Sequence, residues 1–453
     1  MESIYHADYW PFAILLSSIA LVVALVSRLR FHPFVALVLA AVFVGLMTPN
    51  LMENKGIVAA LDEPMIAFGV MAGKIAWVIA LAAIIGTAML ESGAAEKIVT
   101  QLLNKLGEKQ AALALLIAAF LLSIPVFLDT VFFLLIPLGI SLALKTGKNY
   151  ILYVIAIGGG AAITHSIVPP TPGPLIMAES LGIELGTVIL SGMILGIIPA
   201  ILVLFIGKRI NEKMDVPIRI ALPENTGDAS EISLTWALAP IVLPILMIGS
   251  GTMVQAITGH VPEWLVFLGN KNLAMAAGAG AALYLWAKSE KMASRELWTK
   301  VGKPLEIGGI IILITSAGGA YGAMINNSGI GEAIRLATEN FPLHFIPLAW
   351  LIAAVLKTAQ GSGTVAMISS VAIMSALIGD GQSLGFHPVY LLMAMGFGSL
   401  FISWMNDSAF WVVARMSGLT EKEALKTWTF LLACISLVGM AQVWLLSYIF
   451  PFV

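Results

Sequence analysis

Two apolar stretches, at 111–144 and 345–378, are too long to be single membrane-spanning helices. Each has about 34 residues, and a helix of that length would measure about 51 Å, whereas the hydrocarbon core of a bilayer is about 30 Å thick. Polar and helix-breaking residues interrupt both near the middle: Ser123, Pro125, Asp129 and Thr130 in the first, and 360–364 (QGSGT) in the second. We therefore expect two re-entrant hairpins whose tips end inside the membrane. The alternative is that each stretch forms two thin full spans.

The rest of the chain is also rich in apolar stretches. Of its 453 residues 59% are apolar and 11% are charged, whereas soluble domains carry about 25% charged residues. These numbers predict an all-α polytopic membrane protein with short loops. The further stretches are 12–27, 33–48, 65–90, 151–178, 185–207, 236–257, 272–287, 305–325, 389–414 and 428–450.

Charge and cysteine content exclude several other classes of protein. A net charge of −2 gives no basic surface for nucleic acid. Cys434 is the one cysteine, so a disulfide framework and a cysteine-based metal site are excluded. We expect no cofactor and no metal centre. An intramembrane hydrolase is disfavoured because adjacent residues such as His165 and Ser166 do not face each other on a helix.

The distribution of basic residues predicts the orientation of the chain. With the N-terminus outside and both hairpins returning to their own side, the outer segments carry only Lys55, Lys271 and Arg335. Most other lysines and arginines then fall in cytoplasmic segments, as the positive-inside rule requires. Both termini are therefore expected outside the cytoplasm.

A short internal repeat indicates two related halves. AMLESGAAEKI at 88–98 is similar to AMINNSGIGEAI at 323–334, and each copy follows a span and precedes a 34-residue hairpin. The first copy would lie inside and the second outside, which predicts inverted repeats at 1–207 and 236–453. The first would hold spans 1–3, hairpin 111–144, broken span 151–178 and span 185–207. The second would hold hairpin 345–378, broken span 389–414 and last span 428–450, after a cytoplasmic linker at 208–235.

Four interruptions of the apolar pattern suggest a buried binding site. They are the hairpin tips at 123–130 and 358–364 and the stretches 163–174 and 403–408. Inverted repeats with broken helices are typical of secondary transporters. A helix that begins inside the membrane presents unpaired N–H groups and the positive end of its dipole, which favours an anion.

The buried ionisable residues coincide with these interruptions. Asp129, Asp407, His165 and Lys357 lie on or beside the breaks, well inside apolar stretches. Charges at that depth are costly and mark functional sites. Simpler roles remain open: both aspartates could cap half-helices, His165 could be a core residue, and Lys357 could snorkel or pair with a carboxylate. The nearby hydroxyls could satisfy only local backbone.

The residues around the breaks resemble those of the gluconate permease family of bacterial proton symporters, within the wider ion-transporter superfamily. The similar segments are ITHSIVPPTPGP (163–174), AQGSGTVAM (359–367), MNDSAFW (405–411) and, more loosely, IPVFLDTVFFLLIPL (124–138). The resemblance implies proton-driven import of a small hydroxylated carboxylate such as gluconate across the bacterial inner membrane. It also implies a homodimer of the elevator type, with a scaffold and a moving transport domain that contains both hairpins.

The resemblance also assigns roles to particular residues. By position it places Gly361, Ser362, Gly363, Thr364, Asn406 and Ser408 at the binding site. We expect Thr130, Thr164, Ser166 and Lys357 to bind substrate with them. Asp129, His165 and Asp407 would serve ion coupling, with Asp407 or Asp129 carrying the proton. The alternatives are a sodium-coupled carboxylate transporter, a D-serine-type amino acid transporter and a passive channel.

Overall fold

The computed structural model describes residues 9–49, 51–52, 56–214, 216–220, 232–330, 333, 344–379 and 384–452. Over these ranges all regular structure is helical and there is no strand. Seven helical segments are long and apolar enough to cross a membrane, and five shorter apolar helices accompany them. The prediction of an all-helical membrane protein is confirmed.

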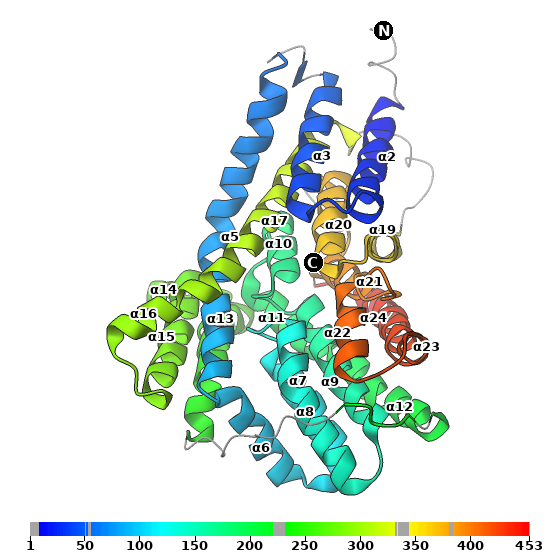
Figure 1. The fold of residues 1–453 in the computed structure, drawn as a ribbon. Coiled ribbons are helices and arrows are strands. Elements are labelled where there is room, and N and C mark those ends of the chain that lie inside the picture. Colours follow the sequence, from blue (N-terminus) through cyan, green and yellow to red (C-terminus); the bar gives the residue numbers. More distant parts are fainter. Residues whose placement is uncertain are drawn as a thin grey trace.

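In Figure 1 the helices of the N-terminal half are coloured from blue to green. They are α2 (Trp10–Val23), α3 (Pro33–Met47), α5 (Ala59–Glu91), α6 (Ala94–Leu106), α7 (Ala111–Leu122), α8 (Leu128–Thr146), α9 (Tyr150–Ile167), α10 (Pro172–Leu181), α11 (Leu185–Leu195) and α12 (Ile197–Lys213).

The C-terminal half begins at Leu234, after the segment that separates the two halves. Its helices are α13 (Leu234–Thr258), α14 (Glu263–Leu268), α15 (Lys271–Ser289), α16 (Ser294–Lys300), α17 (Gly302–Asn327), α19 (Phe345–Gln360), α20 (Gly363–Ile378), α21 (Val389–Gly398), α22 (Ser408–Met416), α23 (Glu421–Ala424) and α24 (Phe430–Ile449).

Each of the two 34-residue stretches is split into a pair of helices. The break between α7 and α8 contains Pro125, which lacks an N–H and cannot continue a helix. Between α19 and α20 the chain turns at Gly361, whose φ of 85° suits a residue without a Cβ. At 12 residues α7 is about 18 Å long, too short to cross a bilayer core. From the middle of the molecule α7 and α8 run toward one end, whereas α20 runs toward the other (Figure 1).

The two stretches expected to be broken are interrupted, although not at the expected boundaries. The first break spans 168–171, narrower than 163–174, because Pro172 fits the first turn of α10, where no N–H is needed. The second spans 399–407, wider than 403–408, and Ser408 already begins α22. Close backbone contacts hold the broken helices together: a Cβ on Gly396 of α21 would lie 2.5 Å from the carbonyl oxygen of Ser166.

Other boundaries also differ from the sequence expectations. The stretch 185–207 consists of two helices, α11 and α12, that meet at Gly196. Because α12 continues to Lys213, residues 208–213 are helical rather than part of a linker, and α13 already includes 234–235. Residues 215 and 221–231 of that linker, and 331, 332 and 334 of the second repeat motif, lie outside the described residues. Helix α6, with polar residues along one side, was not expected.

Two helices, α5 and α17, pack along each other and form the centre of one part of the molecule. Helix α3 packs on both, and α15 packs on α5 and α13. Helices α7–α12 and α19–α24 form the rest, and α17 also packs on α20. Of the helices beside the breaks, α20 packs on α17, and α10 packs on both α17 and α5.

The close contact between α7 and α9 requires a glycine at position 160. A Cβ on Gly160 would lie 2.7 Å from the backbone oxygen of Leu116, closer than packing allows. We predict that Gly160→Ala lowers the stability of the purified protein by about 1–3 kcal/mol through overpacking. Thermal unfolding in detergent measures the loss.

The matched control is Gly280→Ala on α15, where a Cβ would meet nothing within 4 Å. That variant should melt at the wild-type temperature or above, because alanine favours a helix over glycine. Equal melting temperatures for both variants would contradict the packing described here.

Candidate functional site

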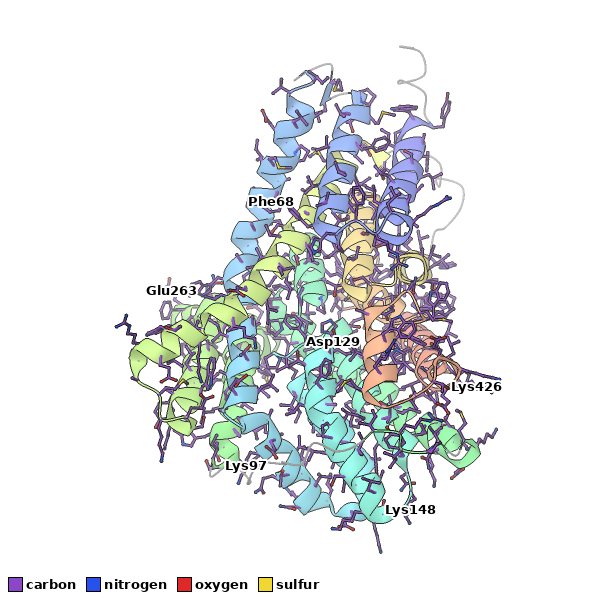
Figure 2. The ribbon with its side chains drawn as sticks, in the orientation of Figure 1. Phe68, Lys97, Asp129, Lys148, Glu263 and Lys426 are labelled. Carbon is purple, nitrogen blue, oxygen red and sulfur yellow. The ribbon has the colours of Figure 1, made fainter. Side chains whose placement is uncertain are left out.

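The four breaks converge on one cavity of about 560 Å³. The helices that follow the breaks, α8, α10, α20 and α22, all line it with their first residues: Asp129, Pro172, Gly363 and Ser408. Figure 2 shows Asp129 near mid-height, between Phe68 toward one end and Lys148 at the other. Four helix N-termini inside the protein make this cavity electrostatically suited to an anion.

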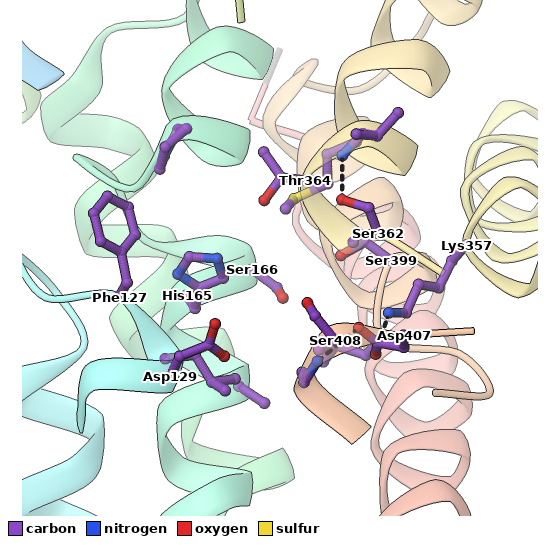
Figure 3. Close-up of a pocket in the computed structure, with 18 of the residues that line it drawn as sticks. Phe127, Asp129, His165, Ser166, Lys357, Ser362, Thr364, Ser399, Asp407 and Ser408 are labelled. Carbon is purple, nitrogen blue, oxygen red and sulfur yellow. Dashed lines mark hydrogen bonds and ion pairs between the residues drawn. The ribbon is translucent and has the colours of Figure 1, made fainter. Parts of the chain in front are cut away.

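One wall of the cavity carries a buried ion pair (Figure 3). The Lys357 ammonium on α19 lies 2.5 Å from Oδ2 of Asp407, and both side chains are 5% exposed. Lys357 also donates to the carbonyl oxygen of Gly361, at the turn of the hairpin. The other carboxylate oxygen of Asp407 accepts the Ala409 N–H at 3.0 Å and so caps α22. The pair therefore ties the second hairpin to the second broken helix.

Two more residues complete the surroundings of Asp407. The Ser403 hydroxyl donates to Oδ2 of Asp407, and the Trp428 indole N–H donates to the Ser403 oxygen at 2.8 Å. Ser403 is fully buried and Trp428 is 2% exposed. This chain of contacts comes from three separate segments, so the sequence alone did not indicate it.

The opposite wall carries Asp129 and His165 (Figure 3). The His165 ring packs edge-on against Phe127, with 6.3 Å between ring centres. Its buried Nδ1 has no hydrogen-bond partner. Asp129, in the first turn of α8, has no hydrogen bond or ion pair with any described residue. This wall therefore offers a carboxylate and an imidazole nitrogen that are free to bind.

Hydroxyl groups line the space between the two walls (Figure 3). The Ser362 oxygen accepts the Val365 N–H at 3.3 Å and caps α20. Ser166, Thr364 and Ser408 also line the cavity, and their hydroxyls bind no other described residue. On the α17 side the lining is apolar, from Ile310, Ile311 and Ile314, with Thr315 beside them.

The structure brings most of the predicted site residues together. Those that line the cavity are Asp129, His165, Ser166, Lys357, Ser362, Gly363, Thr364, Asp407 and Ser408. This arrangement depends on the fold, because the residues come from four segments that are far apart in sequence.

Four of the residues predicted to bind substrate are not among those that line the cavity. Thr164 is fully buried, and its hydroxyl donates to the Gly160 carbonyl on its own helix. The Asn406 amide donates to the Thr358 and Ala359 carbonyls and so fastens the hairpin. Gly361 provides the turn, and Thr130 is absent from the lining.

The sequence reasoning missed several lining residues. Ser399 and Thr315 line the cavity, but both lie in apolar stretches away from the predicted breaks, so no pattern distinguished them. Phe127 and Trp428 contribute aromatic surface.

Comparison with known proteins agrees with this architecture. The family model of GntP family permeases matches residues 10–449. The chain belongs to the GntP permease family. It is 31% identical to the gluconate permease of Pseudomonas aeruginosa, over 99% of both chains. It is 30% identical to the D-serine transporter DsdX of Escherichia coli O6:H1, over 98% of this chain and 100% of that one.

A solved structure has a similar fold. The YdaH transporter of Alcanivorax borkumensis superposes with a TM-score of 0.64 at 15% identity, covering 93% of this chain and 99% of that one. As a GntP-family permease, the chain is a multi-pass membrane transporter and not an enzyme.

Removing one partner of the Lys357–Asp407 pair should destabilise the protein strongly. In Lys357→Met the Asp407 carboxylate stays buried without its cation, which costs about 3–5 kcal/mol. We predict a clear fall in the melting temperature in detergent, and partial recovery in the double variant Lys357→Met/Asp407→Asn.

Lys145→Met serves as the control, because Lys145 and its partner Glu108 are both largely exposed and such pairs contribute little. If Lys357→Met melted at the wild-type temperature, the predicted contribution of the Lys357–Asp407 pair to stability would be contradicted.

Proposed function

We propose that this permease is a secondary-active symporter that imports a small hydroxylated carboxylate, gluconate or a related sugar acid, together with protons. The observation that carries the proposal is the charge balance of the cavity. Asp129 and Asp407 face it, and among the described residues that line it Lys357 is the single cation. A bound monoanion would add a further negative charge in a region of low dielectric, so substrate entry favours the simultaneous binding of a proton.

The polar groups suggest how such a substrate would lie. Its carboxylate would bind at the start of α20, where Gly363 and Thr364 present the helix N-terminus beside the hydroxyls of Ser362 and Thr364. Its hydroxyl groups would bind Ser166, Ser408 and His165. The gluconate permease of Pseudomonas aeruginosa among the relatives supports this substrate class.

We further propose two inverted repeats, at 1–207 and 236–453, that build a scaffold and a moving transport domain. Two glycines in the repeated motifs support this division: Gly93 follows α5 with a φ of 76°, and Gly329 follows α17 with a φ of 79°. The order of elements after each glycine, a helix pair and then a broken helix, is also shared. Transport would proceed by rigid movement of the part that carries both hairpins.

The proposed setting is a homodimer in the bacterial inner membrane with both termini outside. Lys97 and Lys148 lie toward one end of the molecule (Figure 2), which would be the cytoplasmic end. The chain between α12 and α13 would join the repeats on that side.

A second candidate substrate is a D-serine-type amino acid. The free Asp129 carboxylate, opposite the α20 N-terminus, would suit an ammonium group, and DsdX is among the relatives. Gluconate and D-serine can be compared by thermal shift, because a ligand that binds the folded state raises its melting temperature. We expect the larger shift with gluconate.

Transport in proteoliposomes tests the coupling. We predict that a proton gradient directed into the vesicles raises the internal gluconate concentration above the external one. A protonophore should abolish this accumulation, and replacing sodium by choline should leave it unchanged. Uptake that requires sodium would assign the coupling to sodium instead. Single-channel currents without accumulation would show a passive pore and would contradict the proposal.

A further inference from the structure

We propose that Ser403 and Trp428 hold Asp407 as the fixed counter-ion of Lys357, and that the coupled proton binds Asp129. This inference rests on the proposed proton symport and assigns the coupling to one of the two buried aspartates of the cavity.

The contacts of Asp407 suit a carboxylate that serves as a counter-ion. Both of its carboxylate oxygens receive donors: Oδ2 from Lys357 and Ser403, and Oδ1 from the Ala409 N–H. A proton on Oδ2 would compete with the donors from Lys357 and Ser403 and would weaken the ion pair with Lys357. Asp407 is therefore a fixed counter-ion.

The direction of the Ser403 hydroxyl is set by its neighbour. An indole N–H can only donate, and Trp428 donates to the Ser403 oxygen at 2.8 Å. The single proton of Ser403 is then directed to Asp407. A Cβ on Gly158 of α9 would lie 2.7 Å from the Trp428 ring, so the indole is closely packed. The Thr429 hydroxyl also donates to the Ser403 carbonyl.

Asp129 has the opposite surroundings. It lines the cavity and has no hydrogen bond or ion pair with a described residue. Of the helices packed on α8, α7 has no ionisable residue. Helix α9 presents His165 at the cavity, with Tyr150 and Tyr153 toward its other end, and α22 has Asp407 at its start and Arg415, stacked on Trp411, in its last turn.

The charged groups that face Asp129 across the cavity are thus Lys357 and Asp407, which bind each other. A proton on Asp129 would neutralise an uncompensated charge without breaking any contact. The unpartnered Nδ1 of His165, on the same wall (Figure 3), adds an acceptor on that side. A substrate hydroxyl would be a second acceptor.

The test separates gradient-driven accumulation from exchange in proteoliposomes, with gluconate as the substrate. We expect Asp129→Asn to lose accumulation of gluconate driven by a pH gradient while some exchange of gluconate persists. Asp407→Asn should lose both, because it leaves Lys357 unpaired. Glu108→Gln, at an exposed acid far from the cavity, should retain both activities.

Ser403 and Trp428 are positioning residues, and a pH profile reveals their role. In Ser403→Ala one donor to Asp407 is gone, so we expect a second proton-dependent step in the rate of exchange against pH. Ser403→Thr keeps the hydroxyl and should restore the wild-type profile. An identical profile for Ser403→Ala would contradict the assigned role.

A measurement without substrate distinguishes failure of this inference from failure of the proposed function. The infrared difference spectrum between acid and alkaline pH should show a carboxylic-acid band that Asp129→Asn loses and Asp407→Asn retains. Loss of the band in Asp407→Asn alone, or undiminished pH-driven accumulation by Asp129→Asn, would overturn the inference. If the wild type shows the band but no accumulation of gluconate, the proposed function fails instead. Asp129→Glu, which keeps the carboxylate, covers the case in which Asp129→Asn does not fold.

Discussion

The structure depends on four helices that begin inside the protein. Helices α8, α10, α20 and α22 start at a common cavity, where their first N–H groups have no intrahelical partner. Side-chain caps are present on α20 and α22, from Ser362 and Asp407. At the start of α10, Pro172 and Pro174 have no N–H, so fewer N–H groups there need a hydrogen-bond acceptor. The remaining positive potential makes an anion the natural occupant of the cavity.

The Lys357–Asp407 pair has both a structural and an electrostatic effect. It joins the turn of the second hairpin to the start of α22, and it cancels the single cation that faces the cavity in the described chain. Anion binding then relies on helix N-termini and hydroxyls rather than on a free lysine. Because Asp129 is left without a cation, charge neutrality links substrate binding to proton binding in the proposed cycle.

Much of this architecture could be predicted from the sequence, because its signals are local. Pro125, Pro169 and Gly361 interrupt apolar stretches, and membrane burial makes Asp129 and Asp407 conspicuous. The direction of a side chain is not a local property: Thr164 and Ser166 are two residues apart, yet Ser166 lines the cavity and Thr164 does not. The contact between Trp428 and Ser403, and the apolar surface of α17, arise from packing between distant segments, which no pattern in one sequence reveals.

The central claim is that this cavity opens to each side of the membrane in turn. The most direct measurement places a single cysteine at Ser166, with Cys434→Ser as background, and labels it in oriented vesicles with an impermeant thiol reagent. The account predicts labelling from either side, with protection by gluconate, while a cysteine at Ser369, buried in α20 away from the cavity, stays unreactive. Labelling from one side only, whatever the substrate or pH, would contradict it.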